Sequence, residues 1–278
     1  MHLDLYQIEK IVENALKEDI GSGDLTTESL FSEETRRKAV IIFKEEGILA
    51  GLPVAGMVFK KLESGILWEE IKMDGEGVER GQVVAELTGS LRAILKGERT
   101  ALNFLQRLSG IATLTARFVE AIADFPVKIL DTRKIAPGLR VLDKYAVRVG
   151  GGLNHRFGLY DGVIIKVNHI RAVESIFKAI ELVRKNIPQG IKIEVETSTL
   201  DEVREALEAQ ADIIMLDNMP LDMVKEAVSI IGGRALVEVS GGVTLENVRD
   251  IAATGVDFVS VGALTHSPKA IDVSLKVS

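Results

Sequence analysis

The chain has 278 residues, 46% of them hydrophobic, and a formal net charge of -7. This length fits one large domain or two, and it is enough to bury a core without disulfides or a structural metal. The acidic balance argues against nonspecific nucleic-acid binding. The sequence has no cysteine. That excludes a disulfide scaffold, a Cys-based zinc site and a thiol nucleophile, and it fits a reducing, cytoplasmic compartment.

The hydropathy pattern predicts no membrane segment. No stretch reaches the roughly 20 continuous apolar residues of a membrane span. Residues 1–7 lack the basic region and apolar run of a signal peptide. We therefore expect no membrane partner and no nucleic-acid partner.

The first hundred residues predict a small α+β domain. Apolar spacing predicts helices over residues 5–17 and 53–62, and a glycine-punctuated loop covers residues 18–27. Short apolar runs predict strands at residues 38–43, 68–73 and 83–87. Residues 78–87 look like half of a biotinyl or lipoyl hairpin, but no lysine follows at the turn, so they indicate a structural, hammerhead-type β element.

A long helix is predicted over residues 97–122, broken or kinked near Ser109 and Gly110. We place the domain boundary in this helix. The N-terminal α+β domain then covers residues 1–108 and a second domain covers 109–278, whose last residues can pack back on the first.

After residue 127 the pattern alternates between strand and helix. Strands are predicted at residues 128–130, 162–166, 192–196, 213–216, 236–239 and 258–261. Helices are predicted at residues 140–149, 173–186, 200–209, 221–231 and 245–254. This alternation predicts a parallel sheet with right-handed crossovers. About six units with short strands, apolar enough to be buried on both faces, favour an α/β barrel over an open sheet.

Polar or glycine residues follow each predicted barrel strand, where barrel enzymes carry their sites. Four cations, Arg133, Lys134, Arg156 and Lys166, would converge on one rim and bind a polyanion. Arginine supplies a planar two-donor fork and lysine a compact charge. From charge alone, an ordinary solvated helix face explains the basic residues almost as well.

Two carboxylates, Glu196 and Asp217, end successive strands. Oxygen ligands completed by water and ligand phosphates describe a Mg²⁺ site. A salt bridge to a rim lysine is the alternative, and the two interpretations are compatible.

The glycine loops Ser240-Gly241-Gly242 and Val261-Gly262-Ala263 could bring main-chain N–H groups to a phosphate. Alternatively the glycines serve turns, and Thr244 caps a helix. No histidine pair has metal-ligand spacing, and we expect His169 to be a structural, hydrogen-bonding residue.

In combination, several segments make the sequence resemble the quinolinate phosphoribosyltransferase family over nearly its whole length. They are residues 18–27, 97–103, 131–140, 144–147, 150–156 and 261–266. The resemblance implies an α+β hammerhead-like domain followed by an incomplete, about seven-stranded, TIM-like barrel. It also implies a reaction in which quinolinate and phosphoribosyl pyrophosphate (PRPP) give nicotinate mononucleotide, pyrophosphate and CO₂, with Mg²⁺, in NAD biosynthesis.

The resemblance also implies roles for individual residues. The enzyme would be a homodimer in which Arg99 is lent across the interface. Lys134, Lys166, Glu196 and Asp217 would be catalytic, and the last two would hold the metal. The residues that would bind the substrates are Arg99, Thr132, Arg133, Lys134, His155, Arg156, Lys166, Ser240, Gly241, Gly242, Val261, Gly262, Ala263 and His266.

Two residues depart from the family pattern. Ile135 stands where Thr is usual, and Val167 stands where Asp is usual, which removes one rim carboxylate. The departures leave two alternatives open: a paralogous phosphoribosyltransferase-like protein of molybdenum uptake, and a non-catalytic phosphate or nucleotide sensor. The number of retained charges argues against the sensor, because binding phosphate alone needs fewer.

Overall fold

The computed structural model describes residues 5–278, so His2 lies outside the described part. The chain forms two compact units. Unit 1 contains residues up to Ala116, Ile135–Gly151 and Leu264–Ser278; unit 2 contains Arg117–Lys134 and Gly152–Ala263. Each unit is therefore assembled from separate stretches of the chain.

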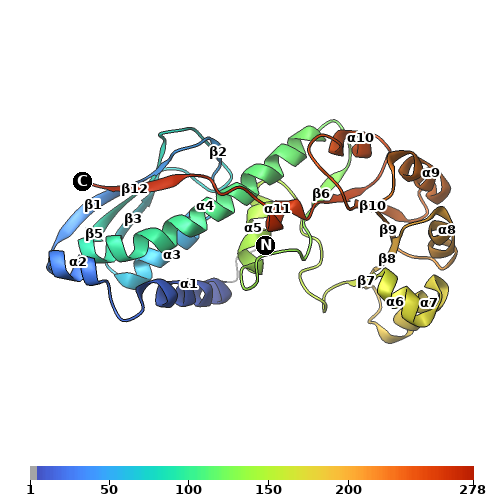
Figure 1. Cartoon of the computed structure of the whole chain (residues 1–278), viewed down its shortest axis with the longest axis horizontal. Helices are drawn as coiled ribbons and strands as arrows, with labels where there is room; N and C mark the ends of the chain where they lie inside the picture. The colour runs from blue at the N-terminus through green and yellow to red at the C-terminus, as the bar shows by residue number, and fades with distance from the viewer. Residues whose placement is uncertain (1–4) are drawn as a thin grey trace. The chain divides into compact units, whose positions relative to one another are not determined.

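Unit 1 is built on a four-stranded antiparallel sheet with the order β12-β1-β5-β3 (Figure 1). Its strands are β1 (Arg36–Phe43), β3 (Leu67–Glu70), β5 (Val83–Ser90) and β12 (Val273–Val277). A separate pair joins β2 (Gly47–Ile48) and β4 (Gly77–Val78). The helices that lie wholly or mostly in this unit are α1 (Leu5–Ile20), α2 (Leu25–Leu30), α3 (Leu52–Leu62), α4 (Leu91–Ala121), α5 (Arg140–Val149) and α11 (Ala263–His266). The last strand, β12, returns to pair with β1 near the start of the chain.

The long helix α4 is continuous through Ser109 and Gly110, so the predicted break there is wrong. The two residues serve packing instead. Ser109 accepts a hydrogen bond from Ala50 N–H and donates one to Ala50 O. A Cβ on Gly110 would overlap the carbonyl of Lys269, so the glycine permits a close main-chain approach without interrupting the helix.

Unit 2 contains a six-stranded parallel sheet with the order β6-β11-β10-β9-β8-β7 (Figure 1). The strands are β6 (Lys128–Leu130), β7 (Val163–Ile165), β8 (Ile193–Thr197), β9 (Ile213–Asp217), β10 (Leu236–Ser240) and β11 (Phe258–Ser260). The intervening helices are α6 (Val167–Val173), α7 (Ile176–Asn186), α8 (Leu200–Glu208), α9 (Leu221–Ile231) and α10 (Val248–Ala252). The predicted α/β architecture is confirmed, and α6 is a helix that the sequence pattern did not predict.

The hydrogen-bonded sheet does not close between its edge strands β6 and β7. An isolated parallel bridge joins Leu130 on β6 to Leu153, so the chain beyond α5 adds a partial seventh position beside that edge. The strands are apolar on their outer faces, where Val195, Leu216 and Val239 are buried. Since side chains alternate along a strand, the intervening residues point to the interior of the barrel.

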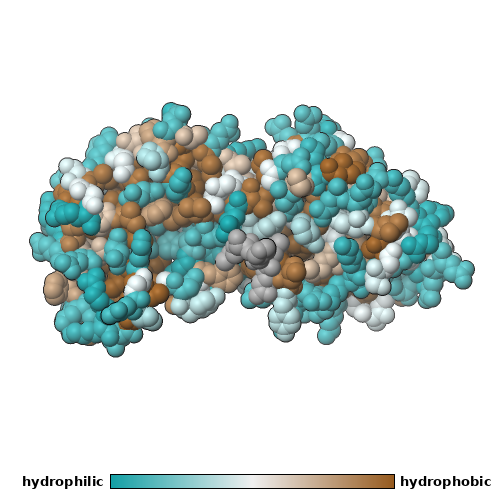
Figure 2. Space-filling view, turned by 180° about the vertical axis from the view of Figure 1, so that it is seen from behind, coloured by the Kyte–Doolittle hydropathy of each residue, from teal (hydrophilic) through white to brown (hydrophobic). Residues whose placement is uncertain are grey.

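The surface mixes residue types. Figure 2 shows hydrophobic residues in several patches among largely hydrophilic ones on the face drawn. Across residues 5–278, no helix combines the length and apolar character needed to cross a membrane.

Candidate active site

A cavity of about 540 Å³ opens at the carboxyl ends of the parallel strands of unit 2. We refer to it as the rim cavity. Every strand of the parallel sheet except β6 contributes a lining residue from within its own bounds, and β6 contributes through the residues that follow it. Its lining is Thr132, Arg133, Lys134, His155, Arg156, Ile164, Lys166, Glu196, Met215, Asp217, Asn218, Glu238, Ser240, Gly241, Gly242 and Ser260.

Charges of both signs meet in the rim cavity. Lys166 Nζ donates a hydrogen bond to Glu196 Oε2 at 3.0 Å, joining the ends of β7 and β8. Asn218 Nδ2 donates to Asp217 Oδ2 at 2.9 Å on the neighbouring strand β9. Arg133 and Lys134 are exposed. These charges can therefore exchange solvent for a ligand at small cost, as deeply buried charges could not.

The loop after β10 is shaped by two glycines in the left-handed region, Gly241 at φ +89° and Gly242 at φ +63°. A Cβ on Gly241 would overlap the Asn218 amide, whereas one on Gly242 would meet open space. The structure thus requires glycine at residue 241 for packing as well as for main-chain conformation. Its main chain lies beside the rim, as a phosphate loop needs.

The Arg156 segment is anchored from below by Asp131, which is fully buried. The Asp131 carboxylate accepts from His155 N–H at 2.9 Å and from Asn154 Nδ2 at 2.7 Å. Arg156 Nη1 then donates to the carbonyl of Gly162 at 2.8 Å. These bonds hold the segment alongside β6, where the Leu130–Leu153 bridge also pairs it.

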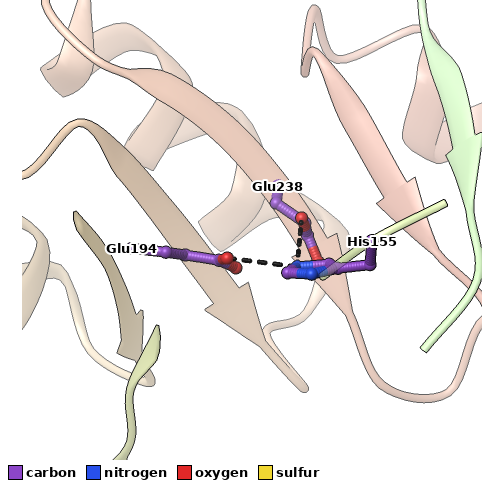
Figure 3. A group of neighbouring side chains, drawn as sticks. All are labelled: His155, Glu194 and Glu238. Carbon is purple, nitrogen blue, oxygen red and sulfur yellow. Dashed lines mark ion pairs between the residues drawn. The ribbon is translucent and has the colours of Figure 1, made fainter. Parts of the chain in front are cut away.

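A buried cluster lies one layer deeper than the rim charges. Glu194 is two residues before Glu196 on β8, and Glu238 is two before Ser240 on β10, so each pair shares a face of its strand. His155 Nε2 lies 3.1 Å from Glu194 Oε2 and 3.5 Å from Glu238 Oε2 (Figure 3). We call His155, Glu194 and Glu238 the floor cluster.

In the floor cluster, burial and ion pairing have opposite effects on the pKa of His155. Burial lowers the pKa of His155, but the hydrogen bonds and charges of Glu194 and Glu238 outweigh burial and raise that pKa to about 10. Burial also raises the pKa of Glu194, with the charge of Glu238 adding to the rise and the hydrogen bond from His155 opposing it. Burial, followed by the positive charge of Arg133, lowers the pKa of Arg156.

The structure brings together most of the residues expected at the site. Thr132, Arg133, Lys134, His155, Arg156, Lys166, Glu196, Asp217, Ser240, Gly241 and Gly242 line the one cavity. Arg99, Val261, Gly262, Ala263 and His266 are not among its lining residues. Arg99 is exposed on α4, and His266 Nδ1 lies 2.5 Å from Ser267 Oγ. The roles of these five residues stay predictions.

The cationic stretch that follows β6 divides between the two units. Arg133 and Lys134 belong to unit 2 and line the cavity. Lys144, on α5 of unit 1, is buried, and its neighbour Asp143 accepts a two-pronged ion pair from Arg107 at 2.9 and 2.8 Å. Part of the apparent basic surface is therefore structural.

Two further expectations concern the segment after β7. His169 makes the structural hydrogen bond expected of it, since its Nδ1 accepts from Lys166 N–H at 2.9 Å. Val167 is the first residue of α6, so the carboxylate usual in the family would stand in the first turn of that helix.

Glu194 and Glu238 were not singled out from the sequence. Each lies in the middle of an otherwise apolar strand, Ile193-Glu194-Val195 and Val237-Glu238-Val239. Glutamate is almost never fully buried unless it is paired. A carboxylate inside a predicted buried strand was the signal that could have revealed the cluster.

The fold and the rim cavity are those of an α/β-barrel protein with a cationic site that can take an anionic ligand. Family models match both parts of the chain: the quinolinate phosphoribosyl transferase N-terminal domain over residues 24–109 and the C-terminal domain over residues 111–276. The chain belongs to the quinolinate phosphoribosyltransferase family.

Individual relatives agree over nearly the full length. A probable nicotinate-nucleotide pyrophosphorylase (carboxylating) of Bacillus subtilis is 46% identical, with 98% of this chain and 94% of the relative covered. Its counterpart in Synechocystis is 48% identical, covering 94% and 90%. The crystal structure of NadC from Streptococcus pyogenes matches with a TM-score of 0.96 and 43% identity over 100% of this chain and 99% of that one.

Proposed function

We propose that the rim cavity is where this phosphoribosyltransferase joins quinolinate to PRPP and releases nicotinate mononucleotide, pyrophosphate and CO₂. The reaction itself follows from the family, which supplies a precursor of NAD. The observation that carries the location is the convergence of four cations, two carboxylates and a glycine loop on one cavity of about 540 Å³. Neither the molybdenum-uptake paralogue nor the phosphate sensor is favoured by the relatives.

The cations of the cavity suit the two substrates. Quinolinate is a dianion and PRPP carries more charge still, so bringing them together needs concentrated positive charge. In the proposal, Arg133 and Arg156 meet the quinolinate carboxylates, because guanidinium binds a carboxylate through two parallel hydrogen bonds. Lys134 and Lys166 supply compact charges where substrate oxygens approach.

The chemistry needs positioning and charge stabilisation. The ring nitrogen of quinolinate attacks C1 of the ribose, and the bond from C1 to pyrophosphate breaks through an oxocarbenium-like state. Glu196 and Asp217 offer negative charge near that cation, and the lysines stabilise the departing pyrophosphate. Loss of CO₂ then follows, because the positive charge of the quaternised ring nitrogen stabilises the carbanion that the breaking C–C bond leaves on the ring, and that carbon takes up a proton from water. No protein base is required for that step.

The metal forms part of the proposal. Glu196 and Asp217 lie on adjacent strands and line the same cavity, and hard carboxylate oxygens completed by water and substrate phosphates suit Mg²⁺. We propose that these two side chains hold Mg²⁺, which supplies charge neutralisation for the pyrophosphate oxygens.

We also propose that the 5′-phosphate of PRPP lies against Ser240, Gly241 and Gly242, with the segment Val261–Ala263 and His266 as further candidates. Gly241 and Gly242 carry no side chains, so phosphate oxygens can approach the main chain of this loop closely. Thr132, whose hydroxyl accepts a hydrogen bond from Lys134 N–H at 3.0 Å, also lines the cavity.

The proposed assembly is a homodimer in which Arg99 reaches the partner's site. Arg99 is exposed on α4. Large apolar side chains are also exposed on the first two helices of the same unit, with Leu25 at 88% and Leu30 at 67%. A contact between copies would cover such residues. The cytoplasmic location also stays part of the proposal, and plant relatives are named as chloroplastic or mitochondrial enzymes.

The direct test combines purified protein, quinolinate, PRPP and Mg²⁺ and follows nicotinate mononucleotide and CO₂. We expect product from quinolinate and little or none when nicotinic acid replaces it. Absence of product from folded protein would overturn the assignment. For the shared site, a mixture of inactive Arg99→Ala and Lys134→Ala chains should regain part of the activity. No recovery after demonstrated subunit exchange would count against Arg99 crossing the interface.

A further inference from the structure

The floor cluster lies between two cavities of unit 2. The rim cavity is above it, and a second cavity of about 410 Å³ is lined by residues deeper in the barrel and along its open side. Four residues line both cavities: His155, Arg156, Ile164 and Glu238. The floor cluster therefore packs beneath the part of the rim cavity that Arg156 lines.

Both ring nitrogens of His155 are engaged inside the protein. Nε2 faces the carboxylates of Glu194 and Glu238, as Figure 3 shows. Nδ1 accepts a hydrogen bond from the main-chain N–H of Arg156 at 2.7 Å. Nδ1 can accept this second bond only while it carries no proton, whereas the raised pKa of the ring favours the doubly protonated form, so the bond from Arg156 N–H and the two carboxylates act in opposite directions on the protonation of His155.

The carboxylates of Glu194 and Glu238 are buried and have few other partners besides His155. Glu194 is 3% exposed and Glu238 1% exposed. In each, the Oε1 atom is buried and has no hydrogen-bond partner among the described residues. Burying such oxygens is costly unless the other contacts of the group compensate for it. The contacts of the Oε2 atoms with His155 therefore have to offset this cost, which ties both carboxylates to the orientation of the imidazole ring.

What the cluster orients is the segment that carries Arg156. That segment lies on the side where the sheet does not close, between β6 and β7, so no regular strand pairing holds it. Asp131 fixes its main chain at His155 N–H, and the His155 ring extends the connection across the barrel interior to β8 and β10. The next residue is Arg156, whose N–H is bound by the same ring.

We propose that Glu194 and Glu238 are positioning residues that, through the His155 ring, set the Arg156 guanidinium at the rim for one carboxylate of the pyridine substrate. In this proposal His155 links the two carboxylates to the main chain of Arg156, and the Arg156 guanidinium contacts the substrate. The proposal rests on the assignment of the rim cavity as the quinolinate site. It predicts that damage to the cluster weakens binding of the dicarboxylate and leaves PRPP binding nearly unchanged.

The kinetic test uses Glu194→Met and Glu238→Met, which remove one acceptor each at nearly constant volume and leave the other carboxylate to pair with His155. Because each variant leaves one carboxylate paired with His155, no buried charge is left without a partner, and these variants are expected to fold. We expect the KM for quinolinate to rise about tenfold or more, with the KM for PRPP within about twofold of the unchanged enzyme. Glu238→Gln, which keeps a carbonyl acceptor, should recover most of the loss. Glu226→Met, an exposed carboxylate on α9, is the matched control.

A spectroscopic test is independent of turnover. The sequence has only four histidines, so ¹⁵N-labelled imidazole signals can be assigned by single substitutions. We expect Glu238→Met to shift the Nε2 signal of His155, because that nitrogen faces the Glu238 carboxylate. This readout separates the two proposals, because it holds even if the enzyme assay fails. If either Met variant proves unfolded, the corresponding Gln variant, which removes the negative charge, is used for the Nε2 measurement.

Three results would overturn the inference. The first is an unchanged quinolinate KM in both Met variants. The second is an equal rise in both substrates' KM values, which would indicate a general loss of barrel structure. The third is a stoichiometric transition metal bound in the purified protein and lost with Glu238→Met. The three groups could hold a cation by geometry, and that result would make the cluster a metal site.

Discussion

The barrel interior holds charged residues in two layers that differ in solvent exposure. At the rim, Lys166 and Glu196 form a partly exposed pair, with side-chain exposures of 49% and 15%. Two residues deeper, Glu194 and Glu238 are buried almost completely around His155. Rim charges can exchange a protein partner for a substrate, whereas floor charges depend on one another. The comparison separates charges that remain accessible to a ligand from charges whose contacts lie inside the protein.

The largest effect is expected from removing a rim charge. Lys166→Met deletes a cation positioned for a substrate oxygen, so kcat/KM should fall by about 100-fold or more, the range typical of losing one preorganised donor. Folding should change little, because the pair with Glu196 is partly exposed. Steady-state kinetics and urea unfolding measure the two effects. Lys185→Met on α7, which removes another exposed lysine paired with Glu181, is the control. Activity within about twofold of the control would place Lys166 outside the reaction.

Metal removal should have the next largest effect. If Glu196 and Asp217 hold Mg²⁺ at the rim, exhaustive chelation should lower the rate by roughly tenfold to a hundredfold, and added Mg²⁺ should restore it. Asp217→Asn should raise the Mg²⁺ concentration that gives half the maximal rate. The floor cluster should bind no metal in the same titration. A full rate in the chelated enzyme would contradict the metal assignment.

Gly241→Ala tests the loop that completes the rim. Residue 241 needs a positive φ, and a Cβ there would displace the Asn218 amide, so we expect the KM for PRPP to rise about tenfold. The quinolinate KM should change much less. Gly242→Ala provides a close comparison, because it carries the same kind of main-chain strain and meets no neighbouring atom. Equal effects of the two substitutions would mean that strain alone, and not the contact with Asn218, decides the outcome.

The sequence pattern predicted most residues that line the rim cavity but missed Glu194 and Glu238 of the floor cluster, and the difference has a physical reason. A residue directly after a buried strand must reach the carboxyl end of the sheet, so Lys166, Glu196 and Asp217 could be brought together from strand order alone. The floor cluster depends on which interior side chains face each other across the barrel. His155 lies on a segment with a single bridge to the sheet, and its reach to Glu194 and Glu238 follows from the three-dimensional curvature of that sheet.

The same distinction explains the mistakes in the elements. Ser109 and Gly110 suggested a helix break because local propensity opposes helix there, but contacts with Ala50 and Lys269 override that propensity. Helix α6 was missed because it is short and has no buried residues, so it carries no apolar periodicity. Helix α5 matched its predicted bounds because it has a strongly amphipathic pattern.

The smallest effect on activity is expected from Thr199, which follows β8 and caps the N-terminus of α8. Thr199, three residues after Glu196, starts α8 in a reciprocal capping arrangement: its hydroxyl accepts from Glu202 N–H at 3.2 Å, and Glu202 Oε2 accepts from Thr199 N–H at 3.1 Å. Thr199→Ala should lower the free energy of unfolding by about 1 kcal/mol, the usual cost of losing an N-cap side chain. Thr199→Ser should restore it. Both variants should keep kcat and both KM values, because Thr199 does not line the rim cavity. A loss of activity that accompanies the loss of stability would show that the position of Glu196 depends on this cap. The helices as well as the strands would then determine the geometry of the rim cavity.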